Sequence, residues 1–509
     1  MIALNEMNEK ILVEIYILLM LVIFNAGCSS DTSPSYPYSS IDPISYKPDY
    51  EVAKQDFISD IEQYLSLIDE VHADPYRLIS QSDLNLVADS IKLVIHHLPV
   101  DSIPLIDCYY YLQYLSAKIH DGHTLIRKPR NWRKLVHSQF PLILYDVQDT
   151  LLIRSNFENE KIPPNAEILS INGIEVRDLR KRSFKYISGT LPGNRAASWA
   201  KEFPFLLQTL FKVQPPWFIR YKFDGVINVD TIKGLPLEEF QEKYLDDYYS
   251  NQIKIDTFLL DSIKIPILKL SAFNYSSYPE YTALIDSFFI MNTGKQNIVI
   301  DIRDNTGGNG LWSIYLLDYF TNSKYSTYEV YKNRISPQLK KWASYQLNLA
   351  YHSAGKSPML FWFYRLRENE LYFKDIIQAK TQTYVELDEQ FHIAHDKKYE
   401  GNVFIITSPR TFSAGVVFVA IFHSENMGIV VGNETGGRIG FNSDPIDVEL
   451  KNSKLVAKIP TAILVLPGSE RDRGLIPDIQ VELNVRQLQQ GKDPYLLSIY
   501  KRTKTEPEK

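Results

Sequence analysis

Three runs of apolar, largely β-branched residues in the C-terminal half constrain the fold of this chain more than any other feature. The runs are NIVIDIR at 297–303, VFIIT at 403–407 and GIVVG at 428–432. Continuous apolar runs of this length are typical of strands buried on both faces of a parallel sheet. Helical segments are expected between them, at 278–291 and 416–422. The alternation predicts an α/β layered core within residues 245–490.

Two further regions precede this core, and a long insertion interrupts it. Apolar residues within 49–130 recur about every 3.6 positions, which predicts an N-terminal helical domain. Residues 135–235 contain short β-type runs, and an Asn-Gly pair at 172–173 is typical of a hairpin turn. This hairpin resembles the core of a PDZ domain, a β-rich module that binds extended peptides by strand addition. The insertion at 322–400 is expected to be helical, and 491–509 a polar tail.

The N-terminus indicates export to the cell envelope. A 12-residue apolar run at 15–26 follows Lys10 and ends in small residues directly before Cys28. The run is too short to span a membrane comfortably, and its layout is typical of a cleaved secretory signal. The position of the cysteine resembles the lipidation site of bacterial lipoproteins. We expect a signal at 1–27, a membrane anchor on Cys28 and a tether at 28–48; an uncleaved signal anchor is the alternative.

Two loops of the predicted core carry residues suited to catalysis, where open α/β sheets place ligand sites. Gly307 and Gly308 follow the first buried strand, and glycines let backbone N–H groups turn toward a ligand oxygen. Ser413 follows the second strand and precedes an apolar helix, whose free N–H donors and dipole suit a nucleophile that passes through an oxyanion. A plain helix N-cap would also place a serine there, so this loop alone leaves both readings open.

Four motifs occur in a fixed order: NIVIDIRDNTGG, TFSAG, GNETGG and GLIPDIQVE. Together, across about residues 100–485, they resemble the C-terminal-processing and tricorn-like serine peptidases of family S41, which have a crotonase- or ClpP-like α/β core. The resemblance implies that Ser413 is the nucleophile in the hydrolysis of a polypeptide substrate. It also implies an oxyanion hole formed by the N–H of Ala414 and that of Gly307 or Gly308.

The residue that acts as general base is less directly assigned, because members of this family use either a lysine or a histidine. One branch uses a lysine, but the corresponding stretch here ends in Arg438, which stays protonated in proteins and cannot accept the serine proton. The tricorn-like branch uses a histidine from the segment before the PDZ-like region, and His123 matches that position. That branch also has a glutamate that orients the histidine. Because its usual position holds Arg471, we expect Glu470 or, second, Asp472 in this role.

Composition excludes other classes of function. Lys and Arg number 55 against 61 Asp and Glu, so the net charge of −6 does not favour nucleic-acid binding. With only two cysteines, a disulfide framework is excluded. Two groups of residues could suggest a metal, namely His120 with His123 and His392 with His395 and Asp396. Neither has further ligands at metal-binding spacing, so we expect no metal and no other cofactor.

Two alternatives to a peptidase stay open. A non-catalytic binder of apolar ligands or peptides on the same fold would agree with the missing glutamate and the aromatic-rich insertion. An esterase would use the same Ser413. Gly122 stands where the tricorn-like site has a serine, which also bears on whether the site is fully active.

Overall fold

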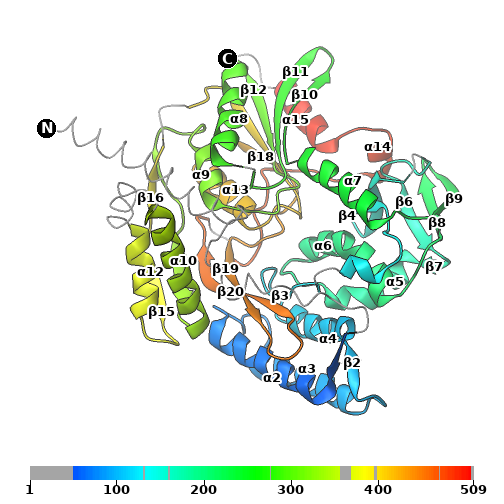
Figure 1. Ribbon diagram of the computed structural model, residues 1–509. Helices are drawn as coiled ribbons and strands as arrows, with labels where there is room; N and C mark the ends of the chain where they lie inside the picture. The colour runs from blue at the N-terminus through cyan, green and yellow to red at the C-terminus, as the bar shows by residue number, and fades with distance from the viewer. Residues whose placement is uncertain are drawn as a thin grey trace.

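The computed structural model describes residues 50–505 apart from 130–131, 159–160, 251, 276, 356–367, 395–397 and 469–470 (Figure 1). The expected signal, tether and lipidated Cys28 therefore lie outside the described residues. Among the helices that are described, none is both long and apolar enough to cross a membrane.

The N-terminal part is helical, as expected, and is drawn in blue in Figure 1. Its elements are β1 (Glu51–Ala53), α2 (Lys54–Val71), α3 (Gln81–His96), β2 (Ser102–Pro104) and α4 (Leu105–Ala117). The apolar faces of the three helices meet around buried residues such as Phe57, Leu84 and Leu112. Helix α3 begins after Ser80, whose hydroxyl accepts the N–H of Asp83 at 3.0 Å.

The next region is β-rich and also contains two α-helices. A sheet in the order β4-β5-β6-β8-β9, with β7 paired to β6, is accompanied by α5 and α6. The bounds are η1 (Trp132–Leu135), β4 (Leu142–Val147), β5 (Thr150–Asn156), β6 (Glu167–Ile171), β7 (Ile174–Glu175), α5 (Val176–Ser183), η2 (Phe184–Tyr186), α6 (Pro192–Phe205), η3 (Leu206–Leu210), β8 (Trp217–Phe223) and β9 (Val226–Ile232). Asn172 and Gly173 have φ of 48° and 78°, as a two-residue hairpin turn requires, so the predicted hairpin is confirmed.

The α/β core is a six-stranded sheet in the order β10-β11-β12-β17-β18-β21, parallel except for β10. Its elements are α7 (Leu237–Ser250), β10 (Ile253–Leu260), β11 (Ile263–Leu270), α8 (Tyr278–Met291), β12 (Asn297–Asp301), α9 (Gly310–Leu317), β17 (Asn402–Thr407), α13 (Ala414–Ser424), β18 (Ile429–Gly432), β21 (Ile479–Gln480) and α14 (Val485–Gln489). Ile298, Ile300 and Ile405 point to one face and pack with α8, α9 and α13. Val299 and Phe404 point to the other face. Because both faces are covered, the central strands are continuously apolar, and the predicted α/β core is confirmed.

The C-terminal segment corrects the expectation of a polar tail at 491–509. Residues Pro494–Thr505 form helix α15 instead. Its buried residues Tyr495, Leu496 and Ile499 cover the second face of the core sheet together with Val299 and Phe404. The spacing of these apolar residues along one side of a helix is the physical reason why the segment is folded.

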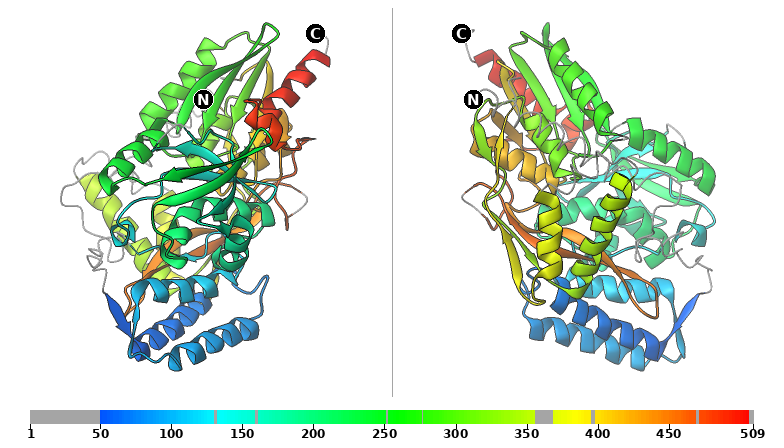
Figure 2. Two further views of the ribbon diagram at one scale, coloured as in Figure 1. Left: turned by 90° about the vertical axis from the view of Figure 1, so that its right-hand side faces the viewer. Right: turned by 60° about the vertical axis from the view of Figure 1, so that its left-hand side comes forward.

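The insertion at 322–400 is not only helical, which corrects a second expectation. It contains β13 (Lys324–Ser326), β14 (Val330–Arg334), α10 (Pro337–Gly355), α12 (Glu368–Gln378), β15 (Tyr384–Leu387) and β16 (Phe391–Ile393). Strands β15 and β14 extend a sheet with β20 (Val456–Val465) and β19 (Gly440–Glu449). Figure 2 shows α10 and α12 beside the N-terminal helices, and Leu339 and Ile376 share a buried cluster with Phe57. The insertion thus ties the N-terminal region to the core.

Candidate active site

Ser413 lies at the carboxyl end of β17, directly before helix α13. Its backbone has φ of 53° and ψ of −122°, in the region that L residues rarely adopt. Such a conformation costs about 1–3 kcal/mol and persists only where the surrounding structure enforces it. The Ser413 side chain makes no capping hydrogen bond to the helix, although the residue stands at the N-cap position. An ordinary N-cap serine therefore does not describe this residue.

His123 comes from the loop after α4 and approaches Ser413 from a segment 290 residues away in sequence. Its Nε2 lies 3.2 Å from Ser413 Oγ. Two residues after His123, β3 (Leu125–Ile126) pairs with β20, which fixes the loop on the sheet next to the core. The imidazole packs against the rings of Phe412 and Phe441, with centroid distances of 4.8 and 5.7 Å. These two aromatic contacts help to hold the ring against the serine.

The protonation of His123 is set mainly by its burial. The residue is 7% exposed, and burial lowers its pKa below the ordinary value of 6.5. The negative charge of Asp121 opposes this shift, while the ammonium of Lys458 adds to it. The histidine is consequently neutral at pH 7, as a group that accepts a proton from serine must be.

The glycine loop after β12 lies directly against the serine. A Cβ on Gly307 would come within 2.6 Å of Ser413 Cβ, so only glycine fits there. The N–H of Gly307 donates to Asn305 Oδ1 at 2.9 Å and is not available to a ligand. Within the described part of the chain, the N–H groups of Gly308 and Ala414 donate to no protein atom. Of the three groups expected from the sequence, these two can stabilise an oxyanion.

Hydrogen bonds between the two loops explain how they are held together. Phe412 N–H donates to the carbonyl of Asn305 at 2.9 Å, and Thr411 Oγ1 donates to that of Ile302 at 2.9 Å. The Asn305 side chain also donates from Nδ2 to Leu270 O at 3.2 Å. These bonds hold the serine loop (408–413) and the glycine loop (302–309) together as one unit at the ends of β17 and β12.

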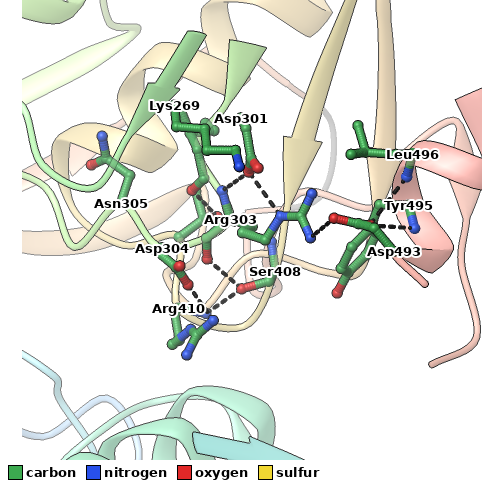
Figure 3. A network of polar contacts seen from close by, with 12 residues as sticks. Lys269, Asp301, Arg303, Asp304, Asn305, Ser408, Arg410, Asp493, Tyr495 and Leu496 are labelled. Atoms are coloured by element: carbon green, nitrogen blue, oxygen red, sulfur yellow. Dashed lines mark hydrogen bonds and ion pairs between the residues drawn. The ribbon is translucent and has the colours of Figure 1, made fainter. Parts of the chain in front are cut away.

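A partly buried ion network supports the same loops (Figure 3). Arg303 donates from Nε to Asp301 Oδ1 at 2.9 Å and from Nη1 to Asp493 Oδ2 at 2.8 Å. Burial alone would lower the pKa of Arg303, but the two carboxylates raise it overall. Arg410 in the serine loop forms a second ion pair, with Asp304 of the glycine loop. Asp493 precedes α15, so the C-terminal helix also anchors the site.

The expected orienting carboxylate is not found in the described structure. Glu470 lies outside the described residues. The Asp472 side chain is 84% exposed and pairs with Arg77 at the surface. Among the described residues, His123 Nδ1 has no hydrogen-bond partner, so the expectation that Asp472 orients this ring is wrong. A carboxylate held in solvent by an arginine is not available to a buried imidazole.

Two residues near His123 were not singled out from the sequence. Asp121 lies in the same loop and accepts the backbone N–H of His123 at 3.1 Å. His72, at the end of α2, lies 3.3 Å from Asp121 through Nε2 and Oδ2. Asp121 could have been noticed by its place two residues before His123. His72 is 51 residues upstream, and no local pattern connects it to the site.

A cleft of about 1900 Å³ opens onto Ser413 and His123. One wall comes from the β-rich region and includes Leu142 and Ile143 of β4 and Ser198 of α6. Another wall comes from the insertion, with aromatic residues such as Trp342 and Tyr372. Its volume exceeds the about 300–1,000 Å³ of typical small-molecule pockets, so the cleft has room for a segment of polypeptide.

Neither histidine group considered for a metal forms such a site in the described residues. No group of three or more potential ligands occurs there. His392 Nε2 instead contacts Asp318 Oδ1 at 2.9 Å, and His395 and Asp396 lie outside the described residues.

Comparisons with known proteins agree with this architecture. Residues 264–481, which include Gly307 and Ser413, match the model of peptidase family S41. The structure of mature CPAF complexed with lactacystin is 14% identical, with a TM-score of 0.61 over 89% of this chain and 98% of that chain. A second structure of mature CPAF is 12% identical, with a TM-score of 0.61 over 88% and 96%. No curated protein sequence matches this chain. At these identities the structures confirm the fold, and the family match confirms the resemblance carried by the four motifs.

Proposed function

Since residues 264–481 belong to peptidase family S41, we propose that Ser413 and His123 hydrolyse peptide bonds of polypeptides. Ser413 Oγ attacks the peptide carbonyl while His123 Nε2 takes its proton, and the imidazolium then protonates the leaving amine. Water then attacks the acyl-enzyme carbonyl while His123 Nε2 takes its proton, and the imidazolium returns a proton to Ser413 Oγ as the bond to the acyl group breaks. The N–H groups of Ala414 and Gly308 bind the oxyanion of each tetrahedral intermediate.

A single observation carries this proposal. The 3.2 Å contact of His123 Nε2 with Ser413 Oγ joins a nucleophile and a base from two distant segments. The serine has a strained backbone and makes no helix cap, so the strain is not explained by helix stability. Gly308 and Ala414 line the same cleft as Ser413, and their N–H groups, which have no protein acceptor in the described structure, supply the remaining requirement for acyl transfer.

A casein hydrolysis assay with the full-length protein in detergent tests the activity. We expect the protein to release peptides from casein, and Ser413→Ala and His123→Ala to abolish the release. Thr411→Ser is a matched control in the same loop, because it keeps the hydroxyl that donates to Ile302. Casein hydrolysis that persists in Ser413→Ala would show that another site is responsible.

The substrate is proposed to enter between β4 and α6. Strand β4 ends the six-stranded sheet of the β-rich region, so its outer backbone edge can pair with an extended peptide. Leu142 and Ile143 of β4 and Ser198 of α6 line the cleft that reaches Ser413. This use of the β-rich region agrees with the PDZ-like role expected from its hairpin.

Ser198→Arg tests this route by filling the groove. Ser198→Ala, which keeps a side chain about as small as serine, is the control. We expect the arginine variant to raise KM for casein while hydrolysis of a small nitrophenyl ester is unchanged. Equal effects on both substrates, or no effect on casein, would contradict a peptide route between β4 and α6.

We also propose that Cys28 anchors the enzyme to a bacterial envelope membrane. The support is the apolar run at 15–26 and the Ser- and Pro-rich segment that follows the cysteine. Cells that express the full chain should incorporate labelled palmitate into it, and Cys28→Ala should prevent incorporation. Cys108→Ala is the control. Because Cys108 is buried, this variant should incorporate as much palmitate as the wild-type chain.

A further inference from the structure

No carboxylate among the described residues contacts Nδ1 of His123. His123 Nδ1 is buried and has no hydrogen-bond partner among the described residues. The backbone of Asn442 lies close enough to favour the protonated ring, but its geometry falls short of a hydrogen bond. The ring therefore depends on its packing and on the loop that carries it.

Asp121 determines the conformation of that loop. Its Oδ1 accepts the backbone N–H of His123 at 3.1 Å, and its Oδ2 accepts the hydroxyl of Thr124 at 2.7 Å. The residue is 6% exposed. Burial raises the pKa of Asp121, but His72, His123 and Thr124 lower it more, so the carboxylate is charged.

His72 completes the arrangement with a defined tautomer. Its Nδ1 accepts the N–H of Asp74 at 3.1 Å, so the ring proton is on Nε2. Nε2 lies 2.8 Å from Thr124 Oγ1 and 3.3 Å from Asp121 Oδ2. Each donor then has one acceptor: His72 donates to Thr124, Thr124 donates to Asp121, and Asp121 also accepts from His123.

This cluster is anchored to the rest of the protein through the backbone of His72 and Ala73. The carbonyl of His72 accepts a hydrogen bond from Arg334 Nη1 at 3.2 Å, and Ala73 N–H donates to Pro460 O at 3.0 Å. Arg334 belongs to β14 and Pro460 to β20. The fully buried His72 thus connects the His123 loop to the sheet that also carries Phe441.

The charged groups that act most on His123 come from its own loop and from strands β19 and β20. Asp121 supplies the largest stabilisation of the protonated ring, and Asp444 of β19 supplies a smaller one. Lys458 of β20 acts in the opposite sense. Removal of the Asp121 charge leaves the imidazolium with a cation and a weaker anion as its charged neighbours.

We propose that Asp121 and His72 are positioning residues for His123. Asp121 fixes the backbone of His123 and stabilises the imidazolium that forms when Ser413 gives up its proton, while His72 and Thr124 hold Asp121 in place. The inference rests on the proposed function of the Ser413–His123 pair. It assigns the orienting role to a buried cluster behind the loop rather than to a carboxylate on the ring nitrogen.

Fluorophosphonate labelling of the full-length protein, measured between pH 4.5 and 8, tests the role of Asp121. We expect Asp121→Asn to lower the maximal labelling rate about 10- to 100-fold with little change in the half-saturating probe concentration. We also expect the acid limb, the decline of the labelling rate at low pH, to move to lower pH in this variant. The reason is that the Asp121 charge favours the protonated form of His123.

Asp60→Asn is the matched control. Asp60 is also fully buried and accepts backbone N–H groups, those of Asn452 and Ser453, but it does not face His123. Asp60→Asn should destabilise the protein without moving the acid limb. The proposal would be overturned if the labelling rate of Asp121→Asn declined at the same acidic pH as that of the wild type and fell by no more than the unfolded fraction of the variant explains.

His72 gives a second test that does not depend on Asp121→Asn folding. His72→Phe should lower the labelling rate about tenfold or more. His72→Gln should recover most of it, because its amide can donate to Thr124. Equal rates for the two variants at equal folded fraction would contradict the role of His72. If the wild type itself is not labelled, the proposed function fails; if it is labelled and these variants behave like it, only the positioning role fails.

Discussion

Gly307→Ala is the substitution whose effect on the site can be worked out most fully. The backbone at Gly307 has φ of +103°, and an added Cβ would lie 2.6 Å from Ser413 Cβ and 3.0 Å from Phe412 O. Carbon atoms in contact are normally about 3.5–4.0 Å apart, so the serine must move by about 1 Å. A displacement of that size costs about 100-fold in rate, which is about 2.7 kcal/mol of transition-state stabilisation. The positive φ adds about 1–3 kcal/mol of strain to the folded state.

Two other glycines separate these effects. Gly173 has φ of +78° and no atom within 4 Å of an added Cβ, so Gly173→Ala has the strain without the collision. Gly310, three residues after Gly307, has neither feature, and alanine there should be tolerated. The test is to measure the fluorophosphonate labelling rate and the denaturation midpoint of all three variants.

The expected pattern is specific. Gly307→Ala should lose about 100-fold in labelling rate, Gly173→Ala should lose about 1–2 kcal/mol of stability with normal labelling, and Gly310→Ala should lose neither. A folded Gly307→Ala protein that is labelled within about threefold of the wild-type rate would refute this account of the glycine loop.

Three further predictions concern the surroundings of the site. Because burial lowers the pKa of His123, labelling should continue as the pH falls through 6.5 and decline only at lower pH; a decline centred at or above 6.5 in a rate-versus-pH profile would contradict this. Asp493→Ala should lower the free energy of unfolding by about 1.5–3 kcal/mol, because it removes one of the two carboxylates that bind Arg303 while Asp301 remains; an unchanged urea midpoint would show that the pair contributes nothing. Gly122→Ser should slow labelling without unfolding the protein, since its Cβ would lie 2.6 Å from Phe412 Cζ and that ring packs on His123; a normal rate would mean that the ring moves aside freely.

Much of the fold follows from local sequence. The buried strands were predictable because strands covered on both faces admit only apolar residues, as in β12 and β17. The hairpin at Asn172 was predictable because two consecutive positive φ values favour Asn-Gly. Helix α8 was predicted with the bounds Tyr278–Met291 that the structure has.

Other parts depend on contacts that no local pattern reports. Strand β14 reads VYKNR and becomes a strand by pairing with β20 more than a hundred residues downstream, where Asn333 lies opposite Ala462. Helix α15 ends in charged residues, which suggested a polar tail, although Tyr495 and Leu496 already carried an apolar face.

The site shows the same division. The positions of Ser413 and Gly307 at strand ends were predictable from the strands themselves, whereas the choice of His123 came only from the resemblance to a family. Nothing near position 72 indicates that its imidazole supports the His123 loop, because that contact arises from the packing of α2 against β20.

The most direct test of the central claim is to identify, by mass spectrometry, the residue that a fluorophosphonate probe modifies in the full-length protein. The account predicts one adduct, on Ser413, that is absent in Ser413→Ala and strongly reduced in His123→Ala. An adduct on a different serine, or no adduct on a folded wild-type protein, would contradict the claim that Ser413 and His123 form an activated nucleophile and base.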